Sequence, residues 1–341
     1  MEFLPQEILI EILEYLNFQE LLNLKKINKY FNNLIKQNKW KYITIIPNSK
    51  MSKKKLVQFI ETHNFINYDF NDFDITDNEL KYLSNCETLN LSWCNITDEG
   101  IQYLRNCNKL NLYQTNITDM GLKYLSNSKN LITCETLNLS YCDITDEGLK
   151  YLSNSKNLNL YRTNITDMGL KYLSNCETLN LGYCKITDEG MQYLRNCNKI
   201  NLYGTNITDM GLKYLSNCKT LNLGYCKITD KGLQYLRNCN KINLYHCDIT
   251  DMGLQYLQNC KQLKLDYNIS NEALKYLSLN MLDLKHYCIS DFELNVLLNS
   301  QLLFFTNPGI TDKGIKCLSN LRILTLCHFA PYKKLKYFLK L

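Results

Sequence analysis

One tripeptide, Ile-Thr-Asp, recurs along most of the chain at a nearly constant spacing, and this spacing constrains the fold more than any other feature. It begins at Ile75, Ile96, Ile117, Ile144, Ile165, Ile186, Ile207, Ile228, Ile249 and Ile310, with Ile-Ser variants at Ile269 and Ile289. The step is 21 residues, or 20 near the end, with one step of 27 that predicts a bulging loop at residues 128–133. Such a period is typical of a solenoid, in which each repeat buries its apolar face against its neighbours.

Inside one unit the apolar residues follow the spacing Cys86-x-x-Leu89-x-Leu91-x-x-Cys94-x-Ile96. Leu89 and Leu91 alternate with Asn90, as in a short strand that buries one face. The spacing resembles the core of a leucine-rich repeat, with a small apolar Cys in the first position. The Thr-Asp-x-Gly-Leu that follows resembles the cysteine-containing leucine-rich repeats of F-box proteins. This resemblance covers roughly residues 65–330.

Polar positions of the repeat have expected structural roles. We expect Asp98 to cap a short helix that packs Ile101 and Leu104 onto the core. The position of Cys94 holds a threonine in alternate units, whose hydroxyl is expected to bond the backbone of the neighbouring turn. These threonines are Thr115, Thr163 and Thr205. Since two unit types alternate, the tandem module is 42 residues long.

The two ends of the repeats depart from the pattern in ways that suit capping units. The first unit is aromatic, with Phe65, Tyr68, Phe70 and Phe73 before Ile75. At the other end, residues 324–326 are expected to begin the last strand, and the Lys-rich tail at 331–341 is expected to cover it.

The first forty residues have a helical period instead. Apolar residues at Leu4, Ile8, Leu9, Ile12, Leu13 and Leu16 follow Pro5, and two further apolar sets lie at 21–27 and 30–35. Three short helices are therefore predicted. The segment resembles an F-box at Leu4, Pro5, Glu7, Ile8, Leu9, Ile12, Leu13, Tyr15, Leu16, Leu21, Leu22, Leu24, Ile27, Asn28, Lys29 and Trp40.

The F-box resemblance implies a Skp-family adaptor as partner and, through it, a cullin. The expected adaptor contacts are Leu4, Pro5, Ile8, Leu9, Ile12, Leu21 and Leu22. We call the three predicted helices together the helical module, and the residues expected in its interior are Leu13, Leu24, Ile27 and Leu34. The alternative is a small helical cap that only covers the end of the solenoid. An isolated bundle of this size buries little surface, which favours a partner.

Together these patterns predict an α/β solenoid: a leucine-rich-repeat horseshoe of about 13 short repeats with a parallel concave sheet, preceded by a small three-helix F-box. The predicted domains are the F-box at 1–45, a linker with a short helix at 46–64, the repeats at 65–330 and a C-terminal cap at 331–341.

Outward strand positions predict a protein-binding face, because aromatic rings supply contact area and amides supply hydrogen bonds. The candidate target-binding residues are Trp93, Tyr113, Tyr141, Tyr161, Tyr183, Tyr203, Tyr225, Tyr245, His246, Lys264, Asp266 and His286. In the alternative interpretation, identical repeats give identical columns without any ligand. Lateral Asn–Asn hydrogen bonds and stacked tyrosines would then only stabilise the sheet.

Composition argues against several other functions. The net charge is +6, but residues 1–64 carry +4 and the tail at 331–341 another +4, which leaves about −2 for the repeats and disfavours nucleic acid. No C-x-x-C pair, P-loop or catalytic motif occurs, so no metal, cofactor or catalysis by this chain is expected. Neither a signal peptide nor a membrane span is evident, and the sixteen cysteines are expected reduced in the cytoplasm or nucleus.

The resemblance implies the substrate-recognition subunit of a Skp–cullin–F-box ubiquitin ligase. Two alternatives stay open: a decoy or assembly factor that binds the adaptor or a target without promoting ubiquitination, and a stand-alone scaffold. The near-identical repeats also resemble F-box/leucine-rich-repeat proteins of large DNA viruses that infect amoebae, which would place the protein in a host cell.

Overall fold

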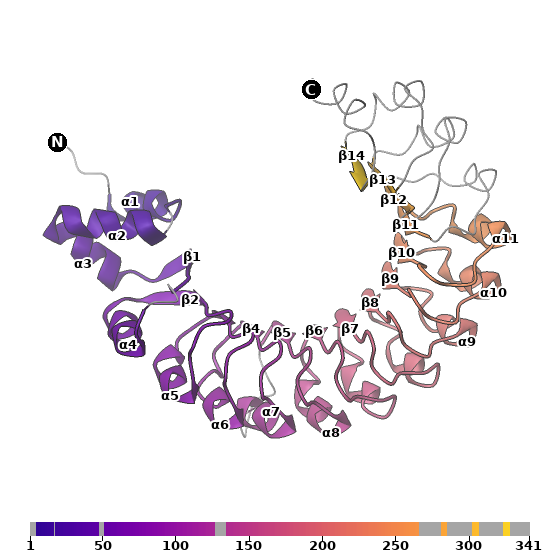
Figure 1. Ribbon diagram of the computed structural model, residues 1–341, viewed down its shortest axis with the longest axis horizontal. Helices are drawn as coiled ribbons and strands as arrows, with labels where there is room; N and C mark the ends of the chain where they lie inside the picture. Colours follow the sequence, from indigo (N-terminus) through magenta and orange to yellow (C-terminus); the bar gives the residue numbers. More distant parts are fainter. Residues whose placement is uncertain are drawn as a thin grey trace. The chain divides into compact units, whose positions relative to one another are not determined.

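The computed structural model describes residues 5–16, 18–47, 51–126 and 134–265, together with the backbone of strands at 281–284, 302–306 and 323–327. The chain divides into two compact units, residues Met1–Asn164 and Ile165–Leu341. In each unit, short parallel strands form one side and short helices lie on the other (Figure 1). The predicted loop at 128–133 and the predicted cap at 331–341 lie outside the described residues.

The strands of the first unit pair in chain order and in parallel. They are β1 (Trp40–Ile45), β2 (Phe65–Asp69), β3 (Thr88–Asn90), β4 (Lys109–Asn111), β5 (Thr136–Asn138) and β6 (Asn157–Asn159). Its helices and 3-10 turns (η) are α1 (Gln6–Leu13), α2 (Phe18–Ile27), α3 (Lys29–Gln37), α4 (Lys53–Thr62), α5 (Asp77–Leu80), η1 (Lys81–Leu83), α6 (Asp98–Ile101), α7 (Asp119–Ser126), α8 (Asp146–Leu149) and η2 (Lys150–Leu152).

The second unit continues the same pattern, again with parallel neighbours. Its strands are β7 (Thr178–Asn180), β8 (Lys199–Asn201), β9 (Thr220–Asn222), β10 (Lys241–Asn243), β11 (Gln262–Lys264), β12 (Met281–Leu284), β13 (Leu302–Thr306) and β14 (Ile323–Cys327). Its helices and turns are η3 (Leu170–Leu173), η4 (Gly190–Tyr193), α9 (Asp209–Leu212), α10 (Asp230–Leu233), η5 (Gln234–Leu236), α11 (Asp251–Leu254) and η6 (Gln255–Leu257). Strands β2 to β14 confirm the predicted number of repeats.

The three predicted N-terminal helices are α1, α2 and α3. Helix α1 begins directly after Pro5, which lacks the N–H that a first helical turn leaves unpaired. Helix α3 is capped by Asn28, whose side-chain oxygen accepts a hydrogen bond from the Phe31 amide at 3.0 Å. The short helix predicted within 46–64 is α4.

Strand β1 was not anticipated, because Trp40 was assigned to the F-box pattern. Trp40 instead opens a strand that pairs with β2, its indole N–H donates to the Ile35 carbonyl at 2.9 Å, and its ring stacks on Phe65. The sheet therefore starts inside the segment predicted as the F-box, at residues 40–45.

In the described repeats the core is built from the predicted apolar positions. Leu89, Leu91, Cys94 and Ile96 are all buried. The Cys94 thiol bonds the Phe70 carbonyl of the preceding unit at 3.1 Å, as expected for this position. Thr115 differs: its hydroxyl donates to the Leu112 carbonyl of its own unit at 2.8 Å, so the expected bond to the backbone of the neighbouring turn is wrong for Thr115.

The aspartate of the repeat links neighbouring units and does not cap its own helix. Thr97 is the N-cap of α6, and its hydroxyl accepts a hydrogen bond from the Glu99 amide. Asp98 lies in the first turn, and its carboxylate accepts from the amide and hydroxyl of Thr118 in the next unit, at 2.8 and 2.6 Å. The predicted capping role of Asp98 is therefore wrong, because the carboxylate reaches a donor about 20 residues away.

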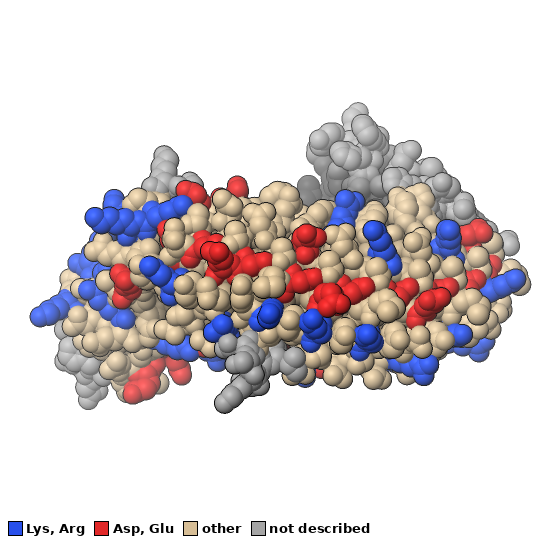
Figure 2. Space-filling view, turned by 90° about the horizontal axis from the view of Figure 1, so that it is seen from below, with Lys and Arg blue, Asp and Glu red and all other residues tan. Residues whose placement is uncertain are grey.

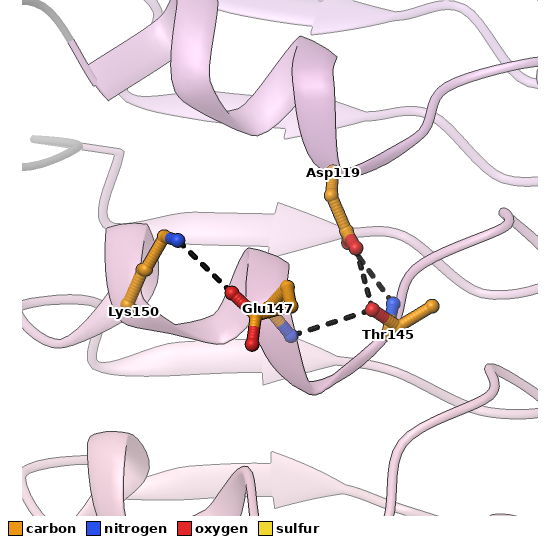
Figure 3. Close-up of polar contacts among 4 residues, drawn as sticks. All are labelled: Asp119, Thr145, Glu147 and Lys150. Atoms are coloured by element: carbon orange, nitrogen blue, oxygen red, sulfur yellow. Dashed lines mark hydrogen bonds and ion pairs between the residues drawn. The ribbon is translucent and has the colours of Figure 1, made fainter.

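The same contact recurs along both units. Figure 3 shows one instance, in which Asp119 accepts from the amide of Thr145 at 3.0 Å and from its hydroxyl. Thr145 in turn caps α8 by accepting from the Glu147 amide, and Glu147 pairs with Lys150 at 3.1 Å. The other described pairs are Asp77–Thr97, Asp167–Thr187, Asp188–Thr208, Asp209–Thr229 and Asp230–Thr250.

Candidate functional site

The first helix presents apolar side chains to the outside. Ile8 and Ile12 are 45% and 48% exposed, and their spacing of four residues places them on one face of α1. Pro5 is exposed and Leu9 is half-buried beside them. These residues form the adaptor candidate, together with Leu4 and Leu22, whose side chains lie outside the described residues.

Two assignments in the helical module are corrected by the structure. Leu21, predicted as an adaptor contact, is fully buried and packs inside the module. Ile27, predicted as internal, is 65% exposed at the end of α2. Leu13 and Leu34 are buried as predicted, and Leu24 is half-buried. Helical spacing identifies apolar faces, but it does not tell which face the neighbouring helices cover.

A polar contact fastens the helical module to the first repeats. The Lys25 ammonium of α2 lies 3.0 Å from Nε2 of His63, the residue that follows α4. Nδ1 of His63 bonds the Phe59 carbonyl at 3.0 Å, and the ring stacks on Phe59 at 4.4 Å. Nδ1 therefore carries the proton, and Nε2 accepts from Lys25.

On the strand side of the first unit, aromatic rings from successive repeats touch one another. We name these rings the first aromatic strip; they are Trp93, Tyr113, Tyr141 and Tyr161. The centroids of successive rings lie 5.6, 5.3 and 5.7 Å apart. Arg162 lies over the Tyr141 and Tyr161 rings at 5.5 and 5.8 Å. Such cation–π contacts add favourable energy where a cation can approach a ring face.

The second unit carries an equivalent second aromatic strip, made of Tyr183, Tyr203, Tyr225, Tyr245 and His246. The four tyrosines pack edge to face at 5.4, 5.1 and 5.7 Å, and His246 lies 4.4 Å from Tyr225 and 4.3 Å from Tyr245. Burial, with the charges and hydrogen bonds of the Tyr183 and Tyr225 phenols, raises the pKa of Tyr203. The Tyr203 phenol is therefore protonated at neutral pH.

The rings form continuous strips because the aromatic residue comes from one of two adjacent strand-end positions, which alternate from repeat to repeat. Tyr183 and Tyr225 lie in the left-handed backbone region, with φ of 58° and 60°. In the repeat between them, Tyr203 occupies the strand-end position one residue earlier. Glycines at the intervening positions Gly204 and Gly224 lie close to the neighbouring rings. A Cβ on Gly204 or Gly224 would lie 2.8 Å from the ring of Tyr183 or Tyr203, respectively.

The asparagine column of the strands bonds within its own strand. The side-chain oxygens of Asn180, Asn201, Asn222 and Asn243 accept from the backbone amide two residues further on, at 3.0–3.2 Å. In the described repeats, none of these four carboxamides bonds another asparagine of the column, so the lateral Asn–Asn bonding considered from sequence is wrong there. The sequence alternative of stacked tyrosines, by contrast, matches the observed ring contacts.

The structure therefore brings together the predicted target-binding residues within each unit, as the two aromatic strips. Lys264 joins the second strip, with its ammonium 5.0 Å above the Tyr245 ring. Asp266 and His286 lie outside the described residues. The asparagine column was noted from sequence but omitted from the predicted site, because its orientation depends on hydrogen bonds that sequence does not show.

The cysteines are packed as core residues. Each described cysteine is buried with a free thiol. Burial raises the pKa of Cys86 to about 12 and that of Cys218 to about 11, despite two backbone hydrogen bonds at Cys218 that oppose the shift. Thiols in this state are poor nucleophiles. Within the described residues, no group of three or more His, Cys, Asp or Glu is placed to hold a metal ion.

Comparison with known families gives two matches. The F-box-like family matches residues 1–46. The leucine-rich-repeat family matches residues 86–104, 135–153, 177–194 and 219–236. The matched repeats each contain the Leu-x-Leu of the strand and are separated by an unmatched unit, which agrees with the alternation of unit types.

Solved structures with similar folds are also leucine-rich-repeat proteins. An internalin of Listeria monocytogenes aligns over 92% of this chain and 94% of its own, with 21% identity and a TM-score of 0.60. The ectodomain of the plant receptor kinase GASSHO1/SCHENGEN3 from Arabidopsis thaliana aligns over 95% of this chain and 47% of its own, with 16% identity and a TM-score of 0.48. At such identities the likeness to the internalin shows the fold alone.

No curated protein matches the chain, and the resemblance to viral proteins stays a prediction. Among the described helices, none has the length and apolar character needed to cross a bilayer. The family matches and the parallel ladders agree with each other: this chain joins an F-box-like N-terminal segment to a leucine-rich-repeat solenoid, the architecture of F-box/leucine-rich-repeat proteins.

Proposed function

We propose that the protein is the substrate-recognition subunit of a Skp–cullin–F-box ubiquitin ligase. In this role the N-terminal helices bind a Skp-family adaptor, which connects the chain to a cullin, and the repeats hold the target protein. The observation that carries the proposal is the F-box-like segment at 1–46, whose first helix exposes Ile8 and Ile12.

The exposed face of α1 is suited to a partner. Ile8, Ile12 and Tyr15 are large apolar side chains, and Tyr15 is 91% exposed. An exposed apolar cluster of this kind is stabilised when another protein covers it. The opposite side of the module is already used, because Leu13, Leu21 and Ile35 are buried there.

The helical module is held to the repeats by structured contacts. Trp40 bonds Ile35 of α3 and stacks on Phe65 of β2, and Lys25 bonds His63. Such contacts suit a receptor, because they hold the adaptor-binding helices against the first repeats. The chain then holds the target close to the ubiquitin-carrying subunits, which makes ubiquitin transfer to the target effectively intramolecular. The transfer reaction itself takes place on partner subunits.

The test is co-purification of a Skp-family adaptor and a cullin with the full chain and with I8E/I12E. We expect the double substitution to abolish adaptor binding, because two carboxylates would be desolvated in an apolar interface. The matched control is Y42E/I46E, which changes two other apolar side chains that are 69% and 67% exposed. Retention of the adaptor by I8E/I12E would refute the proposed interface.

The target side has a separate readout. Affinity purification with and without residues 1–45 should lose the adaptor and cullin but retain the target. Reconstituted ubiquitination of proteins that co-purify with the repeats should then depend on the intact α1 face. A complex that contains the cullin but modifies no co-purified protein would contradict the receptor role.

A further inference from the structure

On the strand side of the second unit, the asparagine column presents hydrogen-bond donors. Because the side-chain oxygens of Asn180, Asn201, Asn222 and Asn243 are occupied by their own strands, the carboxamide N–H groups are the atoms left for a ligand. Within the described residues these N–H groups make no hydrogen bond. All four residues are half-buried, so part of each remains exposed between the buried leucines.

Cations lie on the same strands. Lys199 and Lys241 are exposed at the starts of β8 and β10, two strands apart and so about 10 Å from each other. Neither forms an ion pair within the described part of the unit. We name the six residues Asn180, Asn201, Asn222, Asn243, Lys199 and Lys241 the donor face.

Acidic residues are absent from the donor-face strands. No Asp or Glu occurs in β7 to β11, and the repeat aspartates instead lie at the starts of the helices on the opposite side. Figure 2, seen from the helix side, shows the acidic side chains gathered there in a band. The donor face ends at β11, because the strand register pairs Lys264 with Asp283 of β12.

In the first unit, an asparagine of the same column binds a carboxylate of the chain itself. In the first unit, Asn90 occupies the same column, and its Nδ2 donates to the Asp69 carboxylate of the neighbouring strand at 2.8 Å. The Asn90 oxygen meanwhile accepts from the Ser92 amide, as its counterparts do in the second unit. Asparagines of the second unit have the same orientation but no such carboxylate.

We propose that the donor face binds an acidic polypeptide segment of the target protein. Its Asp and Glu carboxylates would accept hydrogen bonds from the four carboxamides and pair with Lys199 and Lys241, while the second aromatic strip beside them contacts the apolar parts of the segment. This inference rests on the proposed function, in which the repeats hold a target, and it names the class of segment they recognise. The positive charges of Lys199 and Lys241 are opposite to those of such a segment, which also speeds association.

Single-stranded nucleic acid is the other anionic class, and the ring geometry disfavours it. Bases bind proteins by stacking on exposed ring faces. In the second strip the tyrosines pack edge to face against one another, with interplanar angles of 61° to 67°. The ring faces are therefore partly covered by neighbouring tyrosines.

The test is fluorescence anisotropy with the full chain and three labelled 16-residue peptides: four repeats of Asp-Glu-Tyr-Gly, Gln-Asn-Tyr-Gly or Lys-Lys-Tyr-Gly. We expect only the acidic peptide to bind, with an affinity that falls as salt is raised. Equal binding of the neutral peptide would overturn the proposal. So would tighter binding of a 16-nucleotide oligo-dT that displaces the acidic peptide.

Isosteric variants locate the site. N201D/N222D keeps the oxygens that bond the strand but replaces two donors by carboxylate oxygens, and we expect roughly tenfold weaker peptide binding. N206D/N217D makes the same charge change at exposed positions outside the strands and should bind as the unchanged chain does. Unchanged binding by N201D/N222D would refute the donor face.

A second pair of variants distinguishes loss of the binding site from misfolding. K199E/K241E should weaken binding of the acidic peptide by about tenfold or more, since two attractions become repulsions. K171E/K213E changes the net charge equally on the helix side and should not. Adaptor binding is measured on every preparation. If the unchanged chain binds the adaptor but not the acidic peptide, only this inference is refuted, whereas failure of the unchanged chain to bind the adaptor refutes the proposed function.

Discussion

At the scale of single residues, the glycine of the Thr-Asp-x-Gly-Leu motif at Gly211 is required by the aspartate of the preceding repeat. A Cβ built on Gly211 would lie 2.5 Å from Oδ1 of Asp188, the atom that accepts the Thr208 amide. Glu79 replaces the glycine in the first motif, which no repeat aspartate precedes. Its carboxylate there accepts from the amide and hydroxyl of Thr76. Glycine is therefore required at this position because the aspartate carboxylate leaves no room for a Cβ.

Substitution of Gly211 by alanine should lower stability by roughly 1–3 kcal/mol, because the added methyl forces Asp188 from its position. The cost should be smaller in a chain that already carries D188A, since the clashing carboxylate is gone. Thermal unfolding of the single and double variants measures this coupling. M210A, at a neighbouring side chain that is 62% exposed, is the control. Equal costs of G211A in both backgrounds would contradict the steric explanation.

At the scale of elements, the contact between α2 and the end of α4 depends on a neutral histidine. Burial of His63 lowers its pKa below the ordinary value of 6.5, and the charges of Lys25 and Lys36 act in the same direction, against the Phe59 carbonyl. Protonation of Nε2 would replace the acceptor of the Lys25 hydrogen bond by a second cation. The joint between the helical module and the repeats is therefore sensitive to acid.

A group whose pKa is lower in the folded protein stabilises it above the unfolded pKa and loses that contribution as the pH falls. We expect hydrogen exchange in α2 to accelerate as the pH is lowered from about 7.5 to about 5, after correction for intrinsic exchange rates. H63F should remove this acceleration and H246F, at an exposed histidine, should leave it unchanged. If H63F shows the same pH dependence as the unchanged chain, His63 is not the responsible group.

At the scale of the whole molecule, a buried thiol recurs in both units as part of the core. Burial raises the pKa of Cys176 and Cys197 to about 12 and that of Cys260 to about 11, from an ordinary value of 9.0. Each such thiol favours the folded state while it stays protonated. The contributions add because every repeat unfolds its own cysteine into water.

Stability should therefore fall as the pH rises above about 9, when thiols ionise in the unfolded chain but not in the folded one. The melting temperature, measured between pH 8 and 11 under reducing conditions, should decrease steadily. C176A/C260A costs stability at every pH through its cavities, but its melting temperature should depend less steeply on pH. A melting temperature that does not change up to pH 11 would contradict this prediction.

Much of this architecture could be predicted from the sequence, because the repeat is a local pattern. The alternation of Leu89, Asn90 and Leu91 within a 21-residue period fixes a strand, its buried face and its parallel neighbour. The helical spacing around Ile8 and Leu13 likewise predicts α1 and its apolar face. The aromatic strips follow from the same regularity, since each repeat places a ring at one of two adjacent strand-end positions, next to the ring of the neighbouring repeat.

Other features required the tertiary structure, because they depend on contacts between residues far apart in the chain. Trp40 forms a strand only where β2 offers it a partner. Leu21 is buried and Ile27 exposed because of how the three helices pack, which their spacing does not specify. Asp98 bonds a threonine about 20 residues away, and the carboxamides of the donor face take their orientation from backbone amides that only the folded turns present. Local periodicity encodes which elements form, whereas long-range packing decides which of their groups remain for a partner.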